Sequence, residues 1–144
     1  MRIGVLGMGV TGQAVSRFLL GSGEDVIEID AHPRGNQVSD RDFDQPIDQL
    51  IVSPGISPSH PIYRSSVEKG VEVIGEVELA MRHVRARCVG ITGTNGKTTA
   101  TLLLTHVLKK LGFKAEAVGN IGSPLIDYAE AGKEEILVVE LSSF

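Results

Sequence analysis

Short runs of consecutive apolar residues alternate along the chain with stretches of helical periodicity. The runs over residues 2–6, 25–29 and 49–52 are too short for buried helices and are typical of strands covered on both faces. Between the first two runs, apolar residues recur at i, i+4 from Val10 to Leu19, which predicts a helix that packs on a core. The alternation of strand and helix predicts an α/β fold with parallel sheets.

The same alternation continues to the end of the chain. The further predicted elements are a loop over 31–46, a helix over 61–69, a strand over 71–74, a helix from 75, a strand over 86–91, a helix that ends at Gly112, and strands over 113–118 and 135–141. The helix before Gly112 is expected to face a core through its apolar residues, namely Leu103, Leu104, Val107, Leu108 and Leu111. Ser123 and Pro124 are expected to cap and begin one more helix.

The pattern predicts two domains, with the boundary near residue 85. Residues 1–85 are expected to form a Rossmann-like domain, and residues 86–144 the first part of a phosphate-loop ATPase-type domain. The last strand would leave an unprotected apolar edge near Val138. We therefore expect the N-terminal portion of a longer protein, or an edge covered by a partner or by strand exchange with a second copy.

Composition narrows the class of protein. The 144 residues include 17 glycines and no Trp, which suits an α/β protein with many strand-to-helix turns. The net charge of −4, with both signs interspersed, argues against a nucleic-acid-binding face. The single cysteine, Cys88, fits a reducing compartment, and no apolar run approaches the ~20 residues that span a membrane. A cytoplasmic protein without a nucleic-acid or membrane partner is expected.

The strongest chemical signal is a glycine-rich segment between a predicted strand and a predicted helix. It consists of Gly93, Thr94, Asn95, Gly96, Lys97, Thr98 and Thr99. Glycines let several backbone N–H groups face one hollow, and the helix that follows adds the positive end of its dipole. Lys97 can reach terminal phosphates, and the Thr98 hydroxyl can bind Mg²⁺. The segment predicts nucleotide binding, although the general spacing would place a glycine at Ile91; the alternative is a helix start without a ligand.

A second glycine pattern follows the first predicted strand. Gly7, Gly9 and Gly12 form G-x-G-x-x-G, and the next strand ends on the acidic Asp30. This order is typical of the Rossmann dinucleotide fold, in which the acid binds a ribose hydroxyl. It also serves other ligand phosphates at a helix N-terminus, or simply tight packing of a helix on a strand. The turn Ser53-Pro54-Gly55 would lie at the same end of the sheet, either as a rigid turn or as part of a ligand site.

Glu140 stands near the end of the last apolar strand. A buried acid at that position is costly unless it is paired or bound to a metal. In a phosphate-loop protein the position can reach Mg²⁺ directly or through water. The alternative is a partly exposed acid at a strand end.

These motifs, taken in order, resemble the Mur ligase family, which builds the peptide stem of peptidoglycan. The likeness spans the chain and includes the unusual glycine spacing of the phosphate loop. The matching segments are 7–12, 53–56, 75–79, 93–99, Gly119-Asn120-Ile121-Gly122 and Val138-Val139-Glu140-Leu141-Ser142-Ser143-Phe144. The resemblance implies an ATP-dependent ligase that adds D-glutamate to UDP-N-acetylmuramoyl-L-alanine through an acyl phosphate. It also implies a monomeric full enzyme whose remaining catalytic parts lie beyond residue 144, so the chain alone is expected to be inactive.

The resemblance assigns expected roles to individual residues. The UDP-substrate is expected to contact Val10, Thr11, Gly12, Asp30, Ser53, Pro54 and Gly55. ATP would be held by Gly93 to Thr99, and Mg²⁺ by Thr98 and Glu140. Asn120 would touch the muramoyl–alanine part, and Lys97, Asn120 and Glu140 are the expected catalytic residues.

Two other functions remain open at this point. An NAD(P)-dependent Rossmann oxidoreductase explains Gly7 to Gly12 and Asp30 but leaves the phosphate loop without a task. A non-catalytic nucleotide-binding module explains both glycine segments without a reaction.

Overall fold

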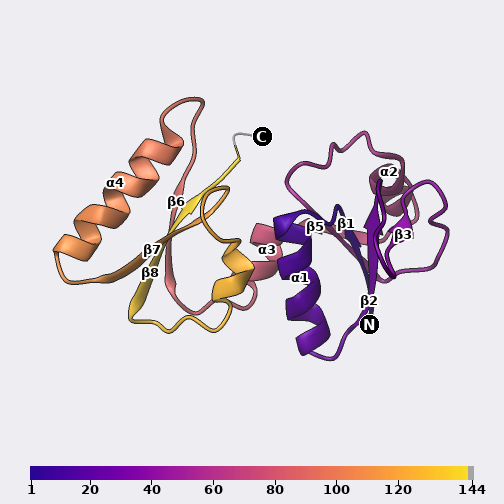
Figure 1. Cartoon of the computed structure of the whole chain (residues 1–144), viewed down its shortest axis with the longest axis horizontal. Helices are drawn as coiled ribbons and strands as arrows, with labels where there is room; N and C mark the ends of the chain where they lie inside the picture. The colour runs from indigo at the N-terminus through magenta and orange to yellow at the C-terminus, as the bar shows by residue number, and fades with distance from the viewer. Residues whose placement is uncertain (143–144) are drawn as a thin grey trace. The chain divides into compact units, whose positions relative to one another are not determined.

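The computed structural model describes residues 1–142 and divides the chain into two compact units, Met1–Leu79 and Ala80–Phe144 (Figure 1). The division falls within helix α3 (Glu76–Met81), and the domain boundary near residue 85 stays a prediction. The last two residues of the family-like C-terminal motif, Ser143 and Phe144, lie outside the described residues. Each unit is described by itself.

The first unit is built on a five-stranded parallel sheet in the order β3-β2-β1-β4-β5. Its strands are β1 (Arg2–Leu6), β2 (Asp25–Asp30), β3 (Val38–Ser39), β4 (Gln49–Val52) and β5 (Glu72–Gly75). Helix α1 (Val10–Gly21) connects β1 to β2, and α2 (Pro61–Glu68) connects β4 to β5. The strand order reverses between β1 and β4, and sheets of this kind bind ligands at the carboxyl ends of the strands at such a point.

The two helices of this unit cover opposite faces of the sheet. Right-handed crossovers that run in opposite directions from the centre place their helices on opposite sides. Successive side chains of a strand point to opposite faces of the sheet, so they pack against different helices. Ile62 of α2 packs with Leu6, Ile29 and Leu50 in one buried cluster. The buried face of α1 consists of Gly12, Ala14, Val15, Ser16 and Leu19.

The predicted loop over 31–46 contains a strand that the sequence pattern does not reveal. The two residues of β3 pair with Ile29 and Asp30 at the edge of the sheet. A two-residue edge strand carries too few positions to show any periodicity. The rest of the segment is irregular, so no helix connects β3 to β4.

The second unit has a three-stranded parallel sheet in the order β6-β8-β7. Its elements are β6 (Arg87–Ile91), α4 (Lys97–Lys110), β7 (Lys114–Gly119), the 3-10 helix η1 (Leu125–Tyr128) and β8 (Glu135–Glu140). The prediction that the last strand is an exposed edge is wrong. β8 lies between β6 and β7, and Val138 is fully buried. Strand exchange through the edge near Val138 therefore loses its basis.

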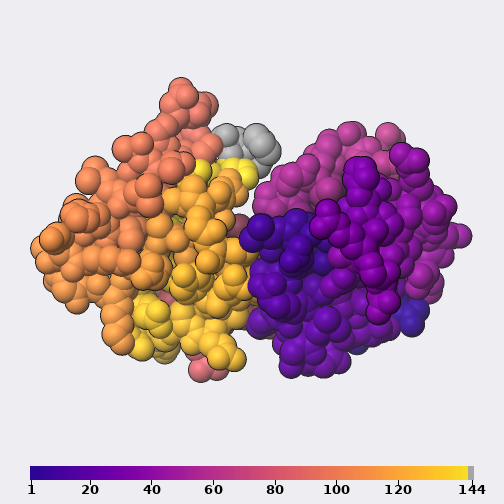
Figure 2. All heavy atoms as spheres, viewed as in Figure 1, coloured from indigo at the N-terminus to yellow at the C-terminus, as the bar shows by residue number. Residues whose placement is uncertain are grey.

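Two predicted helix features of this unit are also wrong. Pro124 precedes the 3-10 helix as its N-cap and is not its first residue. The predicted apolar face of α4 is wrong in part, because Thr101 and Thr105 are buried and Leu104 and Leu108 half-buried, whereas Leu103, Val107 and Leu111 are exposed. Figure 2 shows the atoms of this helix, in orange, at the surface of the second unit. Within residues 1–142, no helix is long and apolar enough to cross a membrane.

Candidate functional site

The turn from Gly7 to Gly12 lies at the carboxyl end of β1, where the strand order of the first unit reverses. Gly7 adopts a φ of +89°, a backbone conformation that residues with a side chain rarely adopt. A Cβ atom on Gly12 would lie 2.0 Å from the carbonyl oxygen of Gly7. The glycines therefore let the start of α1 pack directly against the turn, which leaves the helix N-terminus open at the edge of the sheet.

Asp30 and Ser53 hold this turn from the two neighbouring strands. The Asp30 carboxylate accepts hydrogen bonds from the N–H of Met8 at 2.6 Å and of His32 at 2.9 Å. Both hydrogen bonds hold the pKa of the Asp30 carboxyl below its ordinary value, and the bond from His32 has the larger effect. The hydroxyl of Ser53 donates to the carbonyl of Gly7 at 2.6 Å. Both side chains thus position the glycine turn.

The remaining residues predicted for the UDP-substrate lie around this turn. Pro54 and Gly55 are exposed in the turn after β4, and Thr11 is half-buried at the start of α1. Val10 is 74% exposed. The prediction that Val10 belongs to the core-facing stripe of the helix is therefore wrong, because it lies at the first helical position with its side chain in solvent. A ligand that approaches the turn would meet this exposed apolar side chain.

The phosphate-loop segment has the predicted position between a strand and a helix. It leaves β6 after Ile91 and enters α4 at Lys97. Gly96 is the N-cap of α4 and has a φ of +76°, which lets the chain turn sharply into the helix. Thr94 and Asn95 are exposed, as are Thr98 and Thr99 in the first turn of the helix. The helix N-terminus and the loop amides thus form an accessible anion site.

Thr98 and Glu140 meet at the base of this loop. The hydroxyl of Thr98 donates to Oε2 of Glu140 at 2.9 Å, and Glu140 is only 6% exposed. Within residues 1–142, no three His, Cys, Asp or Glu side chains gather into a metal-binding group. Proteins hold Mg²⁺ with one or two carboxylates, with water and substrate phosphates in the other positions. A hydroxyl beside one buried carboxylate therefore fits Mg²⁺ bound together with a nucleotide.

Asn120 lies at the same edge of the sheet as Glu140. Its N–H donates to the carbonyl of Glu140 at 3.1 Å, and its side-chain amide donates to the Ser142 hydroxyl at 3.0 Å. The hydroxyl of Thr92 donates to the carbonyl of Ser142 at 3.4 Å. Ser142 thus connects the turn after β7 to the phosphate loop.

Sequence reasoning did not assign a position in the site to Thr92 or Ser142. The sequence offered no signal for them, because the register of the sheet, in which Ile91 of β6 and Gly119 of β7 both pair with Glu140, is known only from the structure. Residues that follow these positions must lie at one edge. The predicted ATP and metal residues are brought together in the second unit, and the predicted UDP-substrate residues in the first.

Comparison with known proteins gives one consistent set of relatives. The chain is 39% identical to the UDP-N-acetylmuramoylalanine–D-glutamate ligase of Protochlamydia amoebophila over 97% of its length. It is 40% identical to the ligase of the same name from Chlamydia pneumoniae, and 37% identical to that of Desulfatibacillum aliphaticivorans, each over 99% of the chain. No family model matches the chain.

The chain spans little more than a third of these relatives, between 36% and 37% of their lengths. Among solved structures, it is similar to UDP-N-acetylmuramate-alanine ligase from Thermotoga maritima with a TM-score of 0.55. That match has 20% sequence identity and covers 99% of this chain and 37% of the other. At this identity the structural match shows the parallel α/β fold alone.

Proposed function

Because the chain belongs to the Mur ligase family, we propose that it is the nucleotide-handling part of a UDP-N-acetylmuramoylalanine–D-glutamate ligase. In this proposal the first unit binds the UDP portion of the substrate, and the second unit binds ATP and Mg²⁺. The observation that carries the proposal is similarity to ligases of this one name along nearly the entire chain.

The geometry of the second unit supports ATP binding. An open helix N-terminus with Lys97 beside it suits the charge of a triphosphate. Thr98 and Glu140 would hold Mg²⁺, which neutralises phosphate charge when it is bound. The positions of Lys97 and Glu140, at the ends of adjacent elements, suit a reaction that depends on alignment and charge neutralisation.

The first unit supports a UDP ligand better than a nicotinamide cofactor. In dinucleotide-binding Rossmann folds, the acid at the end of the second strand binds a ribose hydroxyl. Here the Asp30 carboxylate accepts two backbone N–H groups, and its other lone pairs can accept a ribose hydroxyl of either ligand. Similarity along the chain to UDP-N-acetylmuramoylalanine–D-glutamate ligases favours the UDP ligand. An oxidoreductase would also leave the phosphate loop of the second unit without a function.

The proposed reaction forms an amide in two steps. The terminal phosphoryl group of ATP passes to the alanyl carboxylate, which gives an acyl phosphate and ADP. The amine of D-glutamate then attacks the acyl carbon, phosphate leaves, and the ammonium proton is released to solvent. Asn120 would orient the muramoyl–alanine part from the turn beside Glu140.

A thermal-unfolding panel tests this proposal. The chain would be heated with UDP-N-acetylmuramoyl-L-alanine, with ATP and Mg²⁺, or with NAD⁺. A ligand at 100 times its Kd adds about 2.7 kcal/mol of stability, which raises the Tm of a chain of this size by several degrees. We expect the UDP-substrate and ATP with Mg²⁺ to raise Tm. A rise with NAD⁺ and none with the UDP-substrate would replace the ligase proposal with the oxidoreductase.

A further inference from the structure

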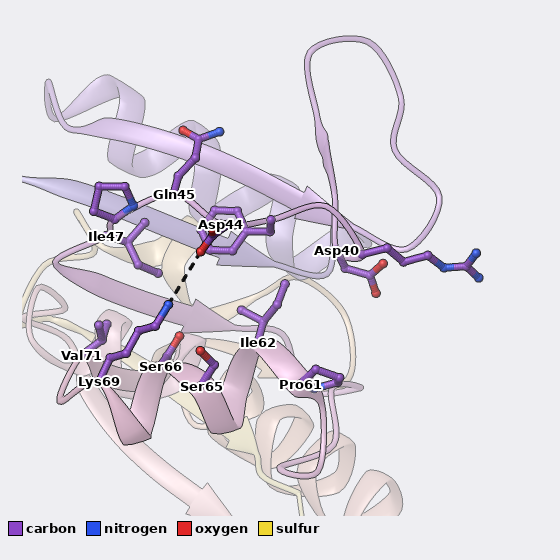
Figure 3. A pocket seen from close by; sticks show the side chains of 13 residues that line it. Asp40, Asp44, Gln45, Ile47, Pro61, Ile62, Ser65, Ser66, Lys69 and Val71 are labelled. Atoms are coloured by element: carbon purple, nitrogen blue, oxygen red, sulfur yellow. Dashed lines mark ion pairs between the residues drawn. The ribbon is translucent and has the colours of Figure 1, made fainter.

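A cavity of about 570 Å³ lies in the first unit (Figure 3). It forms between helix α2 and residues 40–47, the irregular segment that connects β3 to β4. None of its lining residues belongs to the candidate UDP site. Its volume is within the range of small-molecule sites, roughly 300–1,000 Å³.

The cavity has an apolar lining because no helix covers this part of the sheet. Phe43 and Ile47 of the connecting segment, together with Val71, pack only partly on the buried cluster that contains Ile62. These four side chains line the cavity. A flat apolar or aromatic group would therefore bury surface here that the fold leaves partly exposed.

The polar lining comes from both sides of the cavity, namely Asp40, Arg41, Asp44 and Gln45 of the connecting segment and three residues of α2. Ile62, Ser65, Ser66 and Lys69 follow each other at i, i+3, i+4 and i+7, which places them on one side of the helix. Figure 3 shows Ser65 and Ser66 on the cavity side, and Lys69 extending across it toward Asp44. The α2 side of the cavity therefore supplies two hydroxyls and one ammonium group, and the connecting segment supplies two carboxylates, a guanidinium and an amide.

The ion pair between Lys69 and Asp44 is weak. Lys69 Nζ lies 3.9 Å from Asp44 Oδ1, and the two side chains are 66% and 96% exposed. Exposed pairs at such a distance contribute little free energy, about 0–1 kcal/mol. A ligand anion can displace Asp44 at low cost.

A cationic ligand fits the cavity less well. The other acid of the lining, Asp40, binds Nε2 of His60 through Oδ2 at 3.1 Å. Its second oxygen, Oδ1, is buried from solvent and has no hydrogen-bond partner. An incoming ammonium group cannot reach that oxygen without moving the segment.

We propose that this cavity binds an aromatic monocarboxylate. The carboxylate lies at Lys69 and the Ser65 hydroxyl in place of the Asp44 side chain. The aromatic body lies on Phe43, Ile47 and Val71. This site is independent of the proposed ligase function and adds a second small-molecule site to the first unit.

The probe for this proposal is 4-phenylbutyrate, with neutral 4-phenylbutanamide as its matched control. Each would be titrated into the ¹⁵N-labelled full chain and followed by ¹H–¹⁵N NMR. We expect saturable shifts of the Ser65, Lys69 and Val71 amides with the acid, and binding about two- to fivefold weaker with the amide, because Lys69 is exposed. Shifts confined to other residues, no saturable binding, or equal affinity for both probes would overturn the proposal.

Two variants with opposite effects make the test sharper. Lys69→Met should weaken 4-phenylbutyrate binding by about two- to fivefold, because an exposed ammonium is lost. Asp44→Asn should tighten it several-fold, because the competing carboxylate is removed. Asp42→Asn and Lys110→Met, which change exposed charges outside the cavity, should leave the affinity unchanged. Equal affinity in Lys69→Met and the parent chain would show that the carboxylate does not bind at Lys69.

Discussion

At the scale of single residues, the glycine turn of the first unit depends on one missing side chain. Gly12 is buried, and a Cβ atom at this position would overlap the carbonyl oxygen of Gly7. That carbonyl cannot move freely, because it also accepts the hydrogen bond of Ser53. The position thus excludes every residue but glycine as long as α1 keeps its place.

Gly12→Ala should therefore destabilise the first unit by about 1–3 kcal/mol, the usual cost of forcing extra atoms into a packed site. Gly9→Ala is the matched control, because a Cβ atom on Gly9 meets no atom within 4 Å. Chemical denaturation of both variants, followed by circular dichroism, measures the difference. Equal stability of the two variants would contradict the close packing of α1 on the turn.

The sequence predicted which residues gather at this turn but not what each of them does. The structure shows that the Asp30 carboxylate holds the N–H groups of Met8 and His32, and its place near the uridine stays a prediction. Ser53 was expected to line the pocket, yet its hydroxyl is directed to Gly7, 46 positions away in the sequence. Such assignments depend on the separation of strand ends in space, which no local pattern encodes.

At the scale of elements, α4 shows where periodicity misleads. Its leucines and Val107 follow a helical stripe, but the sheet packs against Thr101 and Thr105. These two hydroxyls donate to the carbonyls of Lys97 and Thr101, both at 2.8 Å, so the threonines carry no unsatisfied donor into the core. The half-buried Leu104 and Leu108 share this face with the two threonines, so a search for apolar residues finds only part of it.

Substitutions on the two faces of α4 should therefore have unequal effects. Thr101→Leu should destabilise the second unit by about 1–3 kcal/mol through overpacking. Leu103→Gln should change stability by less than about 0.5 kcal/mol, because Leu103 is 61% exposed. Urea denaturation of both variants provides the comparison. The reverse order would mean that the predicted leucine face packs on the sheet.

The order of strands was the other element-scale feature that the sequence did not predict. The last strand of the second unit was expected at an edge, but β8 lies at the centre with all but one of its six residues buried. Parallel strands are connected by crossovers, so succession along the chain does not determine which strands are neighbours. The fully apolar run over 136–139 was the available signal, because central parallel strands are buried on both faces.

At the scale of the whole molecule, the two candidate sites belong to different compact units. The sequence predicted both glycine-rich turns, because each lies between an apolar strand and a helix, and it predicted the acid at the end of β8, because Glu140 ends an apolar run. The contact between Thr98 and Glu140 joins residues 42 positions apart and required the structure. Because the two candidate sites lie in separate units, we predict that a substitution can weaken the binding of one ligand without changing the binding of the other.

Glu140→Gln tests that separation. Glutamine keeps the size of the side chain and an oxygen that accepts the Thr98 hydroxyl, but it removes the charge that would bind Mg²⁺. Titration calorimetry should show ATP binding in the presence of Mg²⁺ weakened by about tenfold or more, equivalent to about 1.4 kcal/mol. Binding of UDP-N-acetylmuramoyl-L-alanine should be unchanged, as should both affinities in the control Glu116→Gln, which alters an exposed acid of β7. An equal loss of ATP affinity with and without Mg²⁺ would show that Glu140 supports the phosphate loop and does not bind the metal.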